Sequence, residues 1–126
     1  STRLVKMWRK QTGESVQYDI YIGRASYQGG WNLPSSKYIN PYDKMDTSSN
    51  LLVSLDNYRN YIMGRDDLRN GLEYFYGKTM GCWCVDCLDK DLPIPDHYTC
   101  HGQVLMEIMV IMMLAKGLIS LTPTIS

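Results

Sequence analysis

The order of strand-like and helix-like segments is the feature that most limits the folds open to this 126-residue chain. Residues 18–22 (YDIYI) are β-branched and aromatic and are followed at once by Gly23, which predicts a strand that ends sharply. Residues 78–84 (KTMGCWC) are short and apolar, as is typical of a buried strand. Apolar residues at helical spacing lie between the two, over residues 51–62 and 66–76. A strand, then helices, then another strand predicts a parallel crossover and therefore a small Rossmann-like α/β domain.

Further segments extend this prediction toward both ends of the chain. Residues 3–10 mix basic and apolar side chains in the manner of a strand, which could pair with the strand at 18–22 as a hairpin. Residues 102–115 are apolar on nearly all sides of a predicted helix, and residues 118–126 form a short tail. We therefore expect one α/β domain over residues 1–126, in two or three layers, with a short, at least partly parallel sheet and about three helices.

The charges exclude a general electrostatic attraction to nucleic acid or to an anionic membrane. Lysine and arginine together number 13, as do aspartate and glutamate. The longest apolar run, residues 104–114, contains Glu107 and is shorter than the roughly 20 residues that a bilayer span requires. The four cysteines lie close together in the sequence and no signal peptide is visible, which favours an intracellular location, in the cytoplasm or nucleus, over secretion.

Two irregular segments interrupt the predicted elements. Residues 24–47 have no periodicity and are punctuated by glycine, proline and serine, and residues 85–99 are polar and contain proline. Long loops within a compact domain are uncommon and often functional. A solvent-exposed loop without a function would have the same sequence pattern.

Charged and reactive residues follow the predicted strands. Arg24 and Ser26 come after one strand, and Cys82 and Cys84 lie at the end of another. Residues 100–102 (Cys-His-Gly) enter the last helix at its N-terminus, where backbone N–H groups favour an anion or a thiolate. Ligands of open α/β sheets bind beyond the carboxyl ends of the strands, so parallel neighbours would bring these residues to one rim.

Zinc is the first of three chemistries that fit this rim. A closed zinc site needs four sulfur or nitrogen ligands, and the spacing C-x-C-x-x-C, twelve residues and C-H is not that of a standard finger. The candidate zinc ligands are Cys82, Cys84, Cys87, Cys100 and His97. Adjacent Cys100 and His101 would find it awkward to reach one ion together, which favours Cys100 or His97 as the fourth ligand.

The second chemistry needs no metal, and the third interpretation is structural. In the second, Arg24 and the helix start hold a phosphate or carboxylate, and Cys100 is an activated thiolate or His101 an acid/base group. In the third, the cysteines are small buried hydrophobes and His101 is a capping residue with its hydrogen bonds satisfied.

The last helix suggests a partner as well as a core. Helices that are apolar all round are buried or meet a partner, and four methionines in this helix suit either kind of packing. We therefore keep a protein partner, or a homo-oligomer through this helix, as an expectation beside the core.

Four stretches of the sequence resemble the motifs of a known family: YDIYIGRAS, SSKYINPY, GCWC and CHGQVLMEI. In combination, over residues 18–112, they resemble the uncharacterised domain of unknown function 4326, which occurs in bacteria, phages, large DNA viruses and some eukaryotes. The resemblance implies an α/β fold, a site at the motif residues and no particular reaction. The motif residues in this chain are Gly23, Arg24, Ser36, Asn40, Pro41, Cys82, Cys84, Cys100, His101 and Gly102.

The chain also departs from the family pattern. The gap between Cys84 and Cys100 is longer than usual and contains Cys87 and His97, which favours metal binding in this chain. A second α/β family with a similar C-x-E and C-H-R pattern has an acid in place of Cys84, which argues against an obligatory zinc ion.

Together these features favour a small domain that binds or processes a phosphate-bearing ligand, such as a nucleotide or a nucleic-acid end. The candidate ligand-binding residues are Arg24, Ser26, Asn40 and Gly102, and the candidate catalytic residues are Cys100 and His101. Whether the chain is an enzyme stays open. The alternative is a zinc-stapled structural or protein-interaction module without catalysis, as part of a larger, viral assembly.

Overall fold

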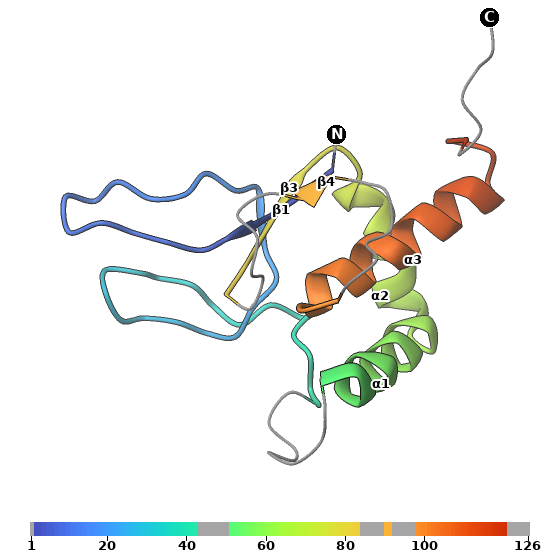
Figure 1. The fold of residues 1–126 in the computed structure, drawn as a ribbon, viewed down its shortest axis with the longest axis horizontal. Helices are drawn as coiled ribbons and strands as arrows, with labels where there is room; N and C mark the ends of the chain where they lie inside the picture. The colour runs from blue at the N-terminus through green and yellow to red at the C-terminus, as the bar shows by residue number, and fades with distance from the viewer. Residues whose placement is uncertain (1, 43–50, 84–89, 92–97, 121–126) are drawn as a thin grey trace, which may run out of the picture.

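The computed structural model describes residues 2–42, 51–83, 90–91 and 98–120. In chain order the elements are β1 (Arg3–Lys6), β2 (Ile20–Tyr21), α1 (Leu51–Met63), α2 (Asp66–Gly71), the 3-10 helix η1 (Leu72–Phe75), β3 (Thr79–Cys82), β4 (Lys90–Asp91) and α3 (His101–Ala115). The strands gather beside the helices, and the segments that follow β1 and β2 extend to one side (Figure 1). Helices and a short, mostly parallel sheet confirm the prediction of a small α/β domain.

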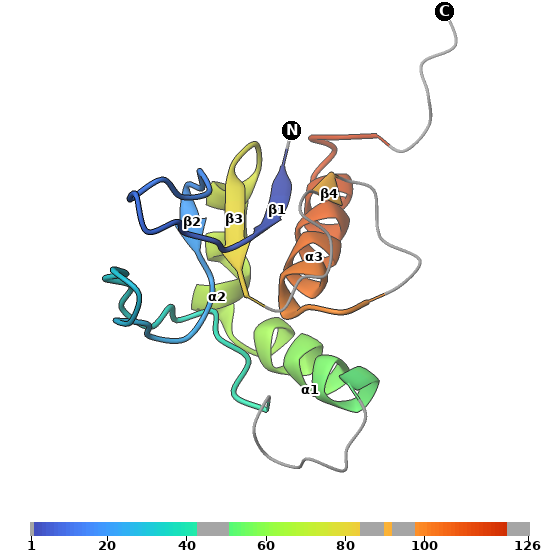
Figure 2. The same ribbon diagram turned by 60° about the vertical axis from the view of Figure 1, so that its left-hand side comes forward.

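Strand β3 has a parallel neighbour at each of its edges. The strand order is β2-β3-β1-β4, and only β4 runs antiparallel to its neighbour (Figure 2). Met80 of β3 lies opposite Leu4 of β1 on one side and Ile20 of β2 on the other. The connection from β2 through α1 and α2 to β3 is the parallel crossover that the order of segments predicts.

The predicted hairpin between the first two strands is wrong, because β3 lies between them. The chain after β1 forms an arm whose two limbs meet at the Arg9–Ser15 bridge, and it returns on the far side of β3, where the Asp19 N–H bonds the Thr79 carbonyl at 2.8 Å. The physical reason is burial: Met80 is fully buried, and a buried strand needs partners for its backbone groups at both edges.

The predicted helix over residues 66–76 is split into α2 and η1. The Tyr38 hydroxyl donates to the Leu68 carbonyl at 2.8 Å, and the Leu72 N–H bonds the carbonyls of Arg69 and Asn70 instead. The turn therefore tightens into a 3-10 helix at this point. Gly77, at φ +81°, then ends the segment in the left-handed conformation expected of a residue after a helix.

Helix α3 packs against the sheet and α1, which accounts for its apolar character (Figure 2). Its buried residues are His101, Gly102, Gln103, Val104, Leu105, Met106, Ile108, Met109, Val110 and Met113. Leu4 and Met80 belong to the same core cluster, so this face of the sheet supports the helix. Contacts within the chain thus cover most of α3, and a protein partner or second copy at this helix stays a prediction.

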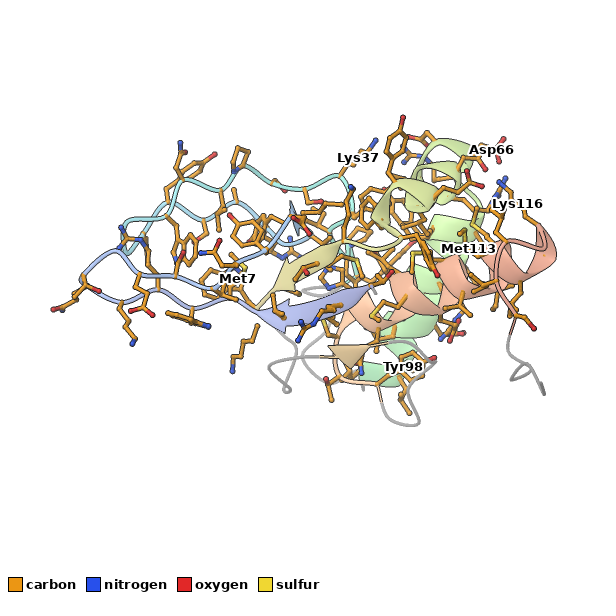
Figure 3. The ribbon with its side chains drawn as sticks, turned by 90° about the horizontal axis from the view of Figure 1, so that it is seen from above. Met7, Lys37, Asp66, Tyr98, Met113 and Lys116 are labelled. Carbon is orange, nitrogen blue, oxygen red and sulfur yellow. The ribbon has the colours of Figure 1, made fainter. Side chains whose placement is uncertain are left out.

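The irregular segments largely match expectation where the structure describes them. Residues 24–42 contain only the isolated Ser26–Leu33 bridge, and the predicted loop over residues 85–99 includes β4. Met7 of the arm and Lys116 after α3 lie toward opposite sides of the molecule (Figure 3). No helix among the described residues has the length and apolar character needed to cross a membrane.

Candidate functional site

The ends of two parallel strands and the start of α3 meet at one edge of the sheet. Cys82 is the last residue of β3, Cys100 is the N-cap of α3, and His101 is the first residue of that helix. All three side chains are buried, with Cys100 fully so. We call these three residues the sulfur site.

The ligand atoms of the sulfur site face one another. The Cys82 and Cys100 sulfurs are 3.2 Å apart, and His101 Nδ1 lies 3.7 Å from Cys82 Sγ and 3.9 Å from Cys100 Sγ. Three such atoms within 4.8 Å of one another could hold a metal ion.

The other ring nitrogen of His101 holds the imidazole in place. His101 Nε2 lies 2.8 Å from the Ile22 carbonyl oxygen, which can only accept a hydrogen bond. Nε2 therefore carries a proton, and in the neutral ring Nδ1 presents its lone pair to the sulfurs. The Tyr58 ring packs edge-on against the imidazole, with centroids 5.3 Å apart. Burial, and after it the nearby Cys100 and Cys82, raises the pKa of Tyr58, so its hydroxyl donates to the Tyr38 carbonyl at 2.6 Å.

Cys100 also caps α3. Its sulfur accepts the Gly102 N–H at 3.3 Å, while the Gln103 side-chain oxygen accepts the Cys100 N–H at 3.0 Å and the Thr99 N–H at 2.6 Å. This reciprocal pattern is a capping box with cysteine in place of serine or threonine. Sequence reasoning missed Gln103, although the C-x-x-Q spacing could have revealed it.

A small open pocket lies against the sulfur site. Its volume is about 120 Å³, and its lining residues are Gly23, Arg24, Ile39, Asn40, Cys82, Trp83 and His101. Arg24 Nη2 donates to the Asn40 carbonyl at 3.0 Å, which holds the guanidinium at the pocket. The Asn40 side chain is fixed in turn, since its Nδ2 donates to Ser54 Oγ at 3.0 Å and its Oδ1 accepts the Tyr42 N–H at 2.9 Å.

Tyr21 links the two strand ends beside this pocket. Its hydroxyl donates to the Arg24 carbonyl and accepts the Trp83 indole N–H at 2.8 Å. Burial raises the pKa of Tyr21, against the lowering effect of the Trp83 bond, which keeps the hydroxyl protonated. Gly23 leaves room for this ring, because a Cβ at this position would lie 2.5 Å from the Tyr21 hydroxyl oxygen. Trp83 also meets Trp31 edge-on, with centroids 5.8 Å apart.

The structure brings six of the sequence-predicted residues to this edge: Gly23, Arg24, Asn40, Cys82, Cys100 and His101. Ser26 pairs with Leu33 and does not line the pocket. Gly102 packs beneath the sheet, where a Cβ would lie 2.6 Å from Leu4 Cδ1. The predicted ligands Cys84, Cys87 and His97 lie outside the described residues.

The remaining pocket residues were not predicted from the sequence. Ile39 and Trp83 line the pocket, and Ile22 contributes through its carbonyl oxygen. A backbone carbonyl has no signature in the side-chain sequence, so the partner of His101 Nε2 emerges only from the fold.

Comparison with known proteins identifies the family to which this chain belongs. The profile of the family described as "Domain of unknown function (DUF4326)" matches residues 5–111. The "Uncharacterized protein R718" of Acanthamoeba polyphaga mimivirus is 36% identical over 105 residues, which cover 83% of this chain and 77% of that protein. No solved structure matches the chain. The chain therefore belongs to the DUF4326 family, and it has a relative in a large DNA virus.

Proposed function

We propose that this domain binds a phosphate-bearing molecule, a nucleotide or a nucleic-acid end, with the phosphate group in the pocket beside Arg24. The observation that carries the proposal is the pocket itself, which joins a guanidinium to the sulfur site at the carboxyl ends of β2 and β3. This edge is where ligands of α/β sheets bind.

Arg24 supplies the charge that a phosphate requires. A guanidinium is always protonated, and its planar set of N–H donors matches the oxygens of a phosphate. The bond to the Asn40 carbonyl orients this group before any ligand arrives, and Asn40 is itself held by Ser54 and Tyr42. A pre-oriented cation lowers the entropy cost of binding.

The size of the pocket suits one phosphate group. Its volume of about 120 Å³ is slightly below that of a cavity of about 150 Å³ that binds benzene. The remainder of a nucleotide would therefore lie outside, near Trp83, which is 40% exposed. An exposed indole next to a phosphate pocket offers a stacking surface for a base.

The setting of His101 favours binding over proton transfer. Its Nε2 is engaged with the Ile22 carbonyl and its Nδ1 faces the two sulfurs, so neither nitrogen is aimed at the centre of a bound phosphate. A general acid or base must lie within hydrogen-bond reach of the proton that it moves. We therefore assign His101 to the wall of the pocket.

The test is thermal unfolding with inorganic phosphate and with a panel of nucleotides, against chloride at equal ionic strength. We expect phosphate-bearing ligands to raise the melting temperature. At a ligand concentration 100-fold above Kd, binding should add about 2.7 kcal/mol to the free energy of unfolding. Arg24→Ala should abolish the shift, whereas Arg65→Ala removes an exposed guanidinium at the N-cap of α2 and should preserve it. An equal shift in both variants would contradict the proposal.

A further inference from the structure

We propose that Cys82, Cys100 and His101 bind one divalent metal ion, zinc or an ion of similar preference, through two thiolates and Nδ1. This site goes beyond the proposed function, because it would exist whether or not a phosphate binds. It also differs from the ligand set that the sequence favoured, in which His101 was set aside for lying next to Cys100.

The adjacency of Cys100 and His101 is no obstacle in the folded chain. Cys100 has extended backbone dihedrals (φ −148°, ψ 144°) as the N-cap, whereas His101 begins the helix. The change of backbone direction between them brings both side chains toward Cys82, so that their ligand atoms lie 3.9 Å apart. The expected difficulty for two adjacent residues therefore does not apply at this junction.

The distances are close to those of a metal site. Zn–S bonds of about 2.3 Å and Zn–N bonds of about 2.0 Å at tetrahedral angles place two sulfurs about 3.8 Å apart and a sulfur and a nitrogen about 3.5 Å apart. The two S–N distances, 3.7 and 3.9 Å, already agree within a few tenths of an ångström. The sulfurs, at 3.2 Å, would separate by about half an ångström to admit the ion.

The His101 ring has the second contact that metal-binding histidines require. A ligating imidazole usually donates its other N–H to a carboxylate or a backbone carbonyl, which fixes the tautomer and the ring orientation. The Ile22 carbonyl serves this purpose at 2.8 Å from Nε2. Packing alone does not require Nδ1 to face two sulfurs, so the orientation argues for a ligand role over a purely structural one.

The charges of the site balance. Two thiolates neutralise a divalent cation, so the complex would add no net charge to a buried region. Cys82 and His101 line the pocket as well, whereas Cys100 is fully buried behind them. An ion held by all three would therefore border the pocket, and among the residues that the structure describes these three ligands would leave one tetrahedral position open.

One consequence rests on the proposed function: a phosphate oxygen would occupy that open position. Because the thiolates already neutralise the ion, the attraction for the anion would come chiefly from Arg24, whose guanidinium borders the same pocket. The ion would then orient one phosphate oxygen, and Arg24 would supply the positive charge that attracts the phosphate.

The primary experiment is elemental analysis of untagged protein after reconstitution with zinc. We expect one equivalent of zinc per chain in the parent protein. In Cys82→Ser and in His101→Gln the zinc content should fall about tenfold or more. The matched controls are Cys84→Ser and Cys87→Ser, which remove sulfurs near in sequence and should retain the metal. No metal in the parent, or an equal loss in either control, would overturn the proposed site, and the latter would point to a closed staple.

A second measurement guards against variants that fail to fold. The parent protein reconstituted with cobalt should show thiolate-to-metal charge-transfer absorption of two thiolates and a tetrahedral ligand-field spectrum. An absorption intensity that corresponds to three or four thiolates would overturn the three-residue site without any substitution.

Adding inorganic phosphate separates this inference from the proposed function. Bound metal with no phosphate-induced rise in melting temperature would overturn the proposed function and leave the metal site standing. A phosphate-induced rise in protein that binds no metal would do the reverse. With both present, a cobalt spectrum that phosphate does not change would overturn the placement of phosphate on the ion.

Discussion

Helix α3 carries two polar clusters that differ in how their groups are balanced. At its start is the sulfur site, which borders the pocket. Two turns further on, Glu107 meets Arg59 of α1 and Tyr98. Arg59 binds the carboxylate through two nitrogens, with Nε 2.5 Å from Oε2 and Nη2 3.1 Å from Oε1. Tyr98 donates its hydroxyl to Oε1, and we call these three residues the ion cluster.

The pKa shifts of Glu107 and Tyr98 show that the groups of the ion cluster stabilise one another's charge states. Burial raises the pKa of Glu107, but the bonds from Arg59 and Tyr98 outweigh burial and hold the pKa below its usual value. Burial and the bond to Glu107 raise the pKa of Tyr98 to about 12. Each group thus stabilises the charge state of its neighbours.

The comparison shows how one helix can serve two purposes. In the ion cluster the Glu107 carboxylate is paired with the Arg59 guanidinium and accepts the Tyr98 hydroxyl. We therefore expect the cluster to stabilise the packing of α1 on α3. The sulfur site consists of two sulfurs and an imidazole at the edge of a pocket that also carries Arg24. We expect changes in the ion cluster to alter stability alone, and changes at the pocket to alter ligand binding.

The largest effect on stability should come from Arg59→Met. The substitution leaves the Glu107 carboxylate, which is only 13% exposed, without its cation. We expect a loss of about 2 kcal/mol in the free energy of unfolding, less than the 3–5 of a fully buried pair because Arg59 is partly exposed. Urea denaturation measures it. The exposed pair of Arg65 and Asp67 provides the control, since Arg65→Met should cause no measurable loss. Similar losses in the two variants would remove the distinction between cluster and surface.

Gly102→Ala should destabilise the start of α3 through packing rather than charge. The new Cβ would lie 2.6 Å from Leu4 Cδ1 and 2.9 Å from Ile22 Cδ1, and both side chains are fully buried. We expect a loss of about 1–2 kcal/mol, since gained helix propensity offsets part of the overpacking. Leu4→Val removes the crowded methyl groups, so the double variant should lose less than the sum of the two single changes. Simple additivity, measured by the same denaturation, would show that the contact is not the cause.

The pH dependence of Glu107→Gln should separate the two clusters further. Because the folded pKa of Glu107 is lowered, its contribution is present above the unfolded pKa of about 4.3 and is lost as the pH falls through the folded value. The difference of about 1 kcal/mol between parent and variant at neutral pH should therefore shrink between about pH 5 and pH 3. Gly102→Ala, which changes no charge, should keep a constant difference over the same range. A Glu107→Gln difference that did not vary with pH would refute the balance described above.

Arg24→Ala should have the smallest effect on folding. It removes the hydrogen bond to the Asn40 carbonyl at the edge of an open pocket, where water can replace the donor. We expect a loss of about 0.5 kcal/mol in urea denaturation, together with the loss of phosphate binding. A loss as large as that of Arg59→Met would mean that Arg24 acts mainly in the structure.

Much of the fold followed from local patterns, and the exceptions have definite causes. The strand around Tyr21 and the helix that starts near Cys100 were predictable, because alternation and helical spacing report burial within a few residues. The first two strands were wrongly expected to pair, because nothing in their own sequences tells that β3 will lie between them. The helix after Asp66 was expected to be longer, because the Tyr38 bond that shortens it comes from a distant segment.

The sequence by itself determined most of the helices and strands, though not β4 or the split after α2, and it determined that a parallel crossover joins two strands and which reactive residues follow the strands. Only the tertiary structure decided that His101 turns Nδ1 to the sulfurs, since this depends on the Ile22 carbonyl, 79 residues away. It likewise paired Arg59 with Glu107, 48 residues apart. Propensity and periodicity act between near neighbours in the chain, whereas the distances between atoms of remote segments are set by how the elements pack.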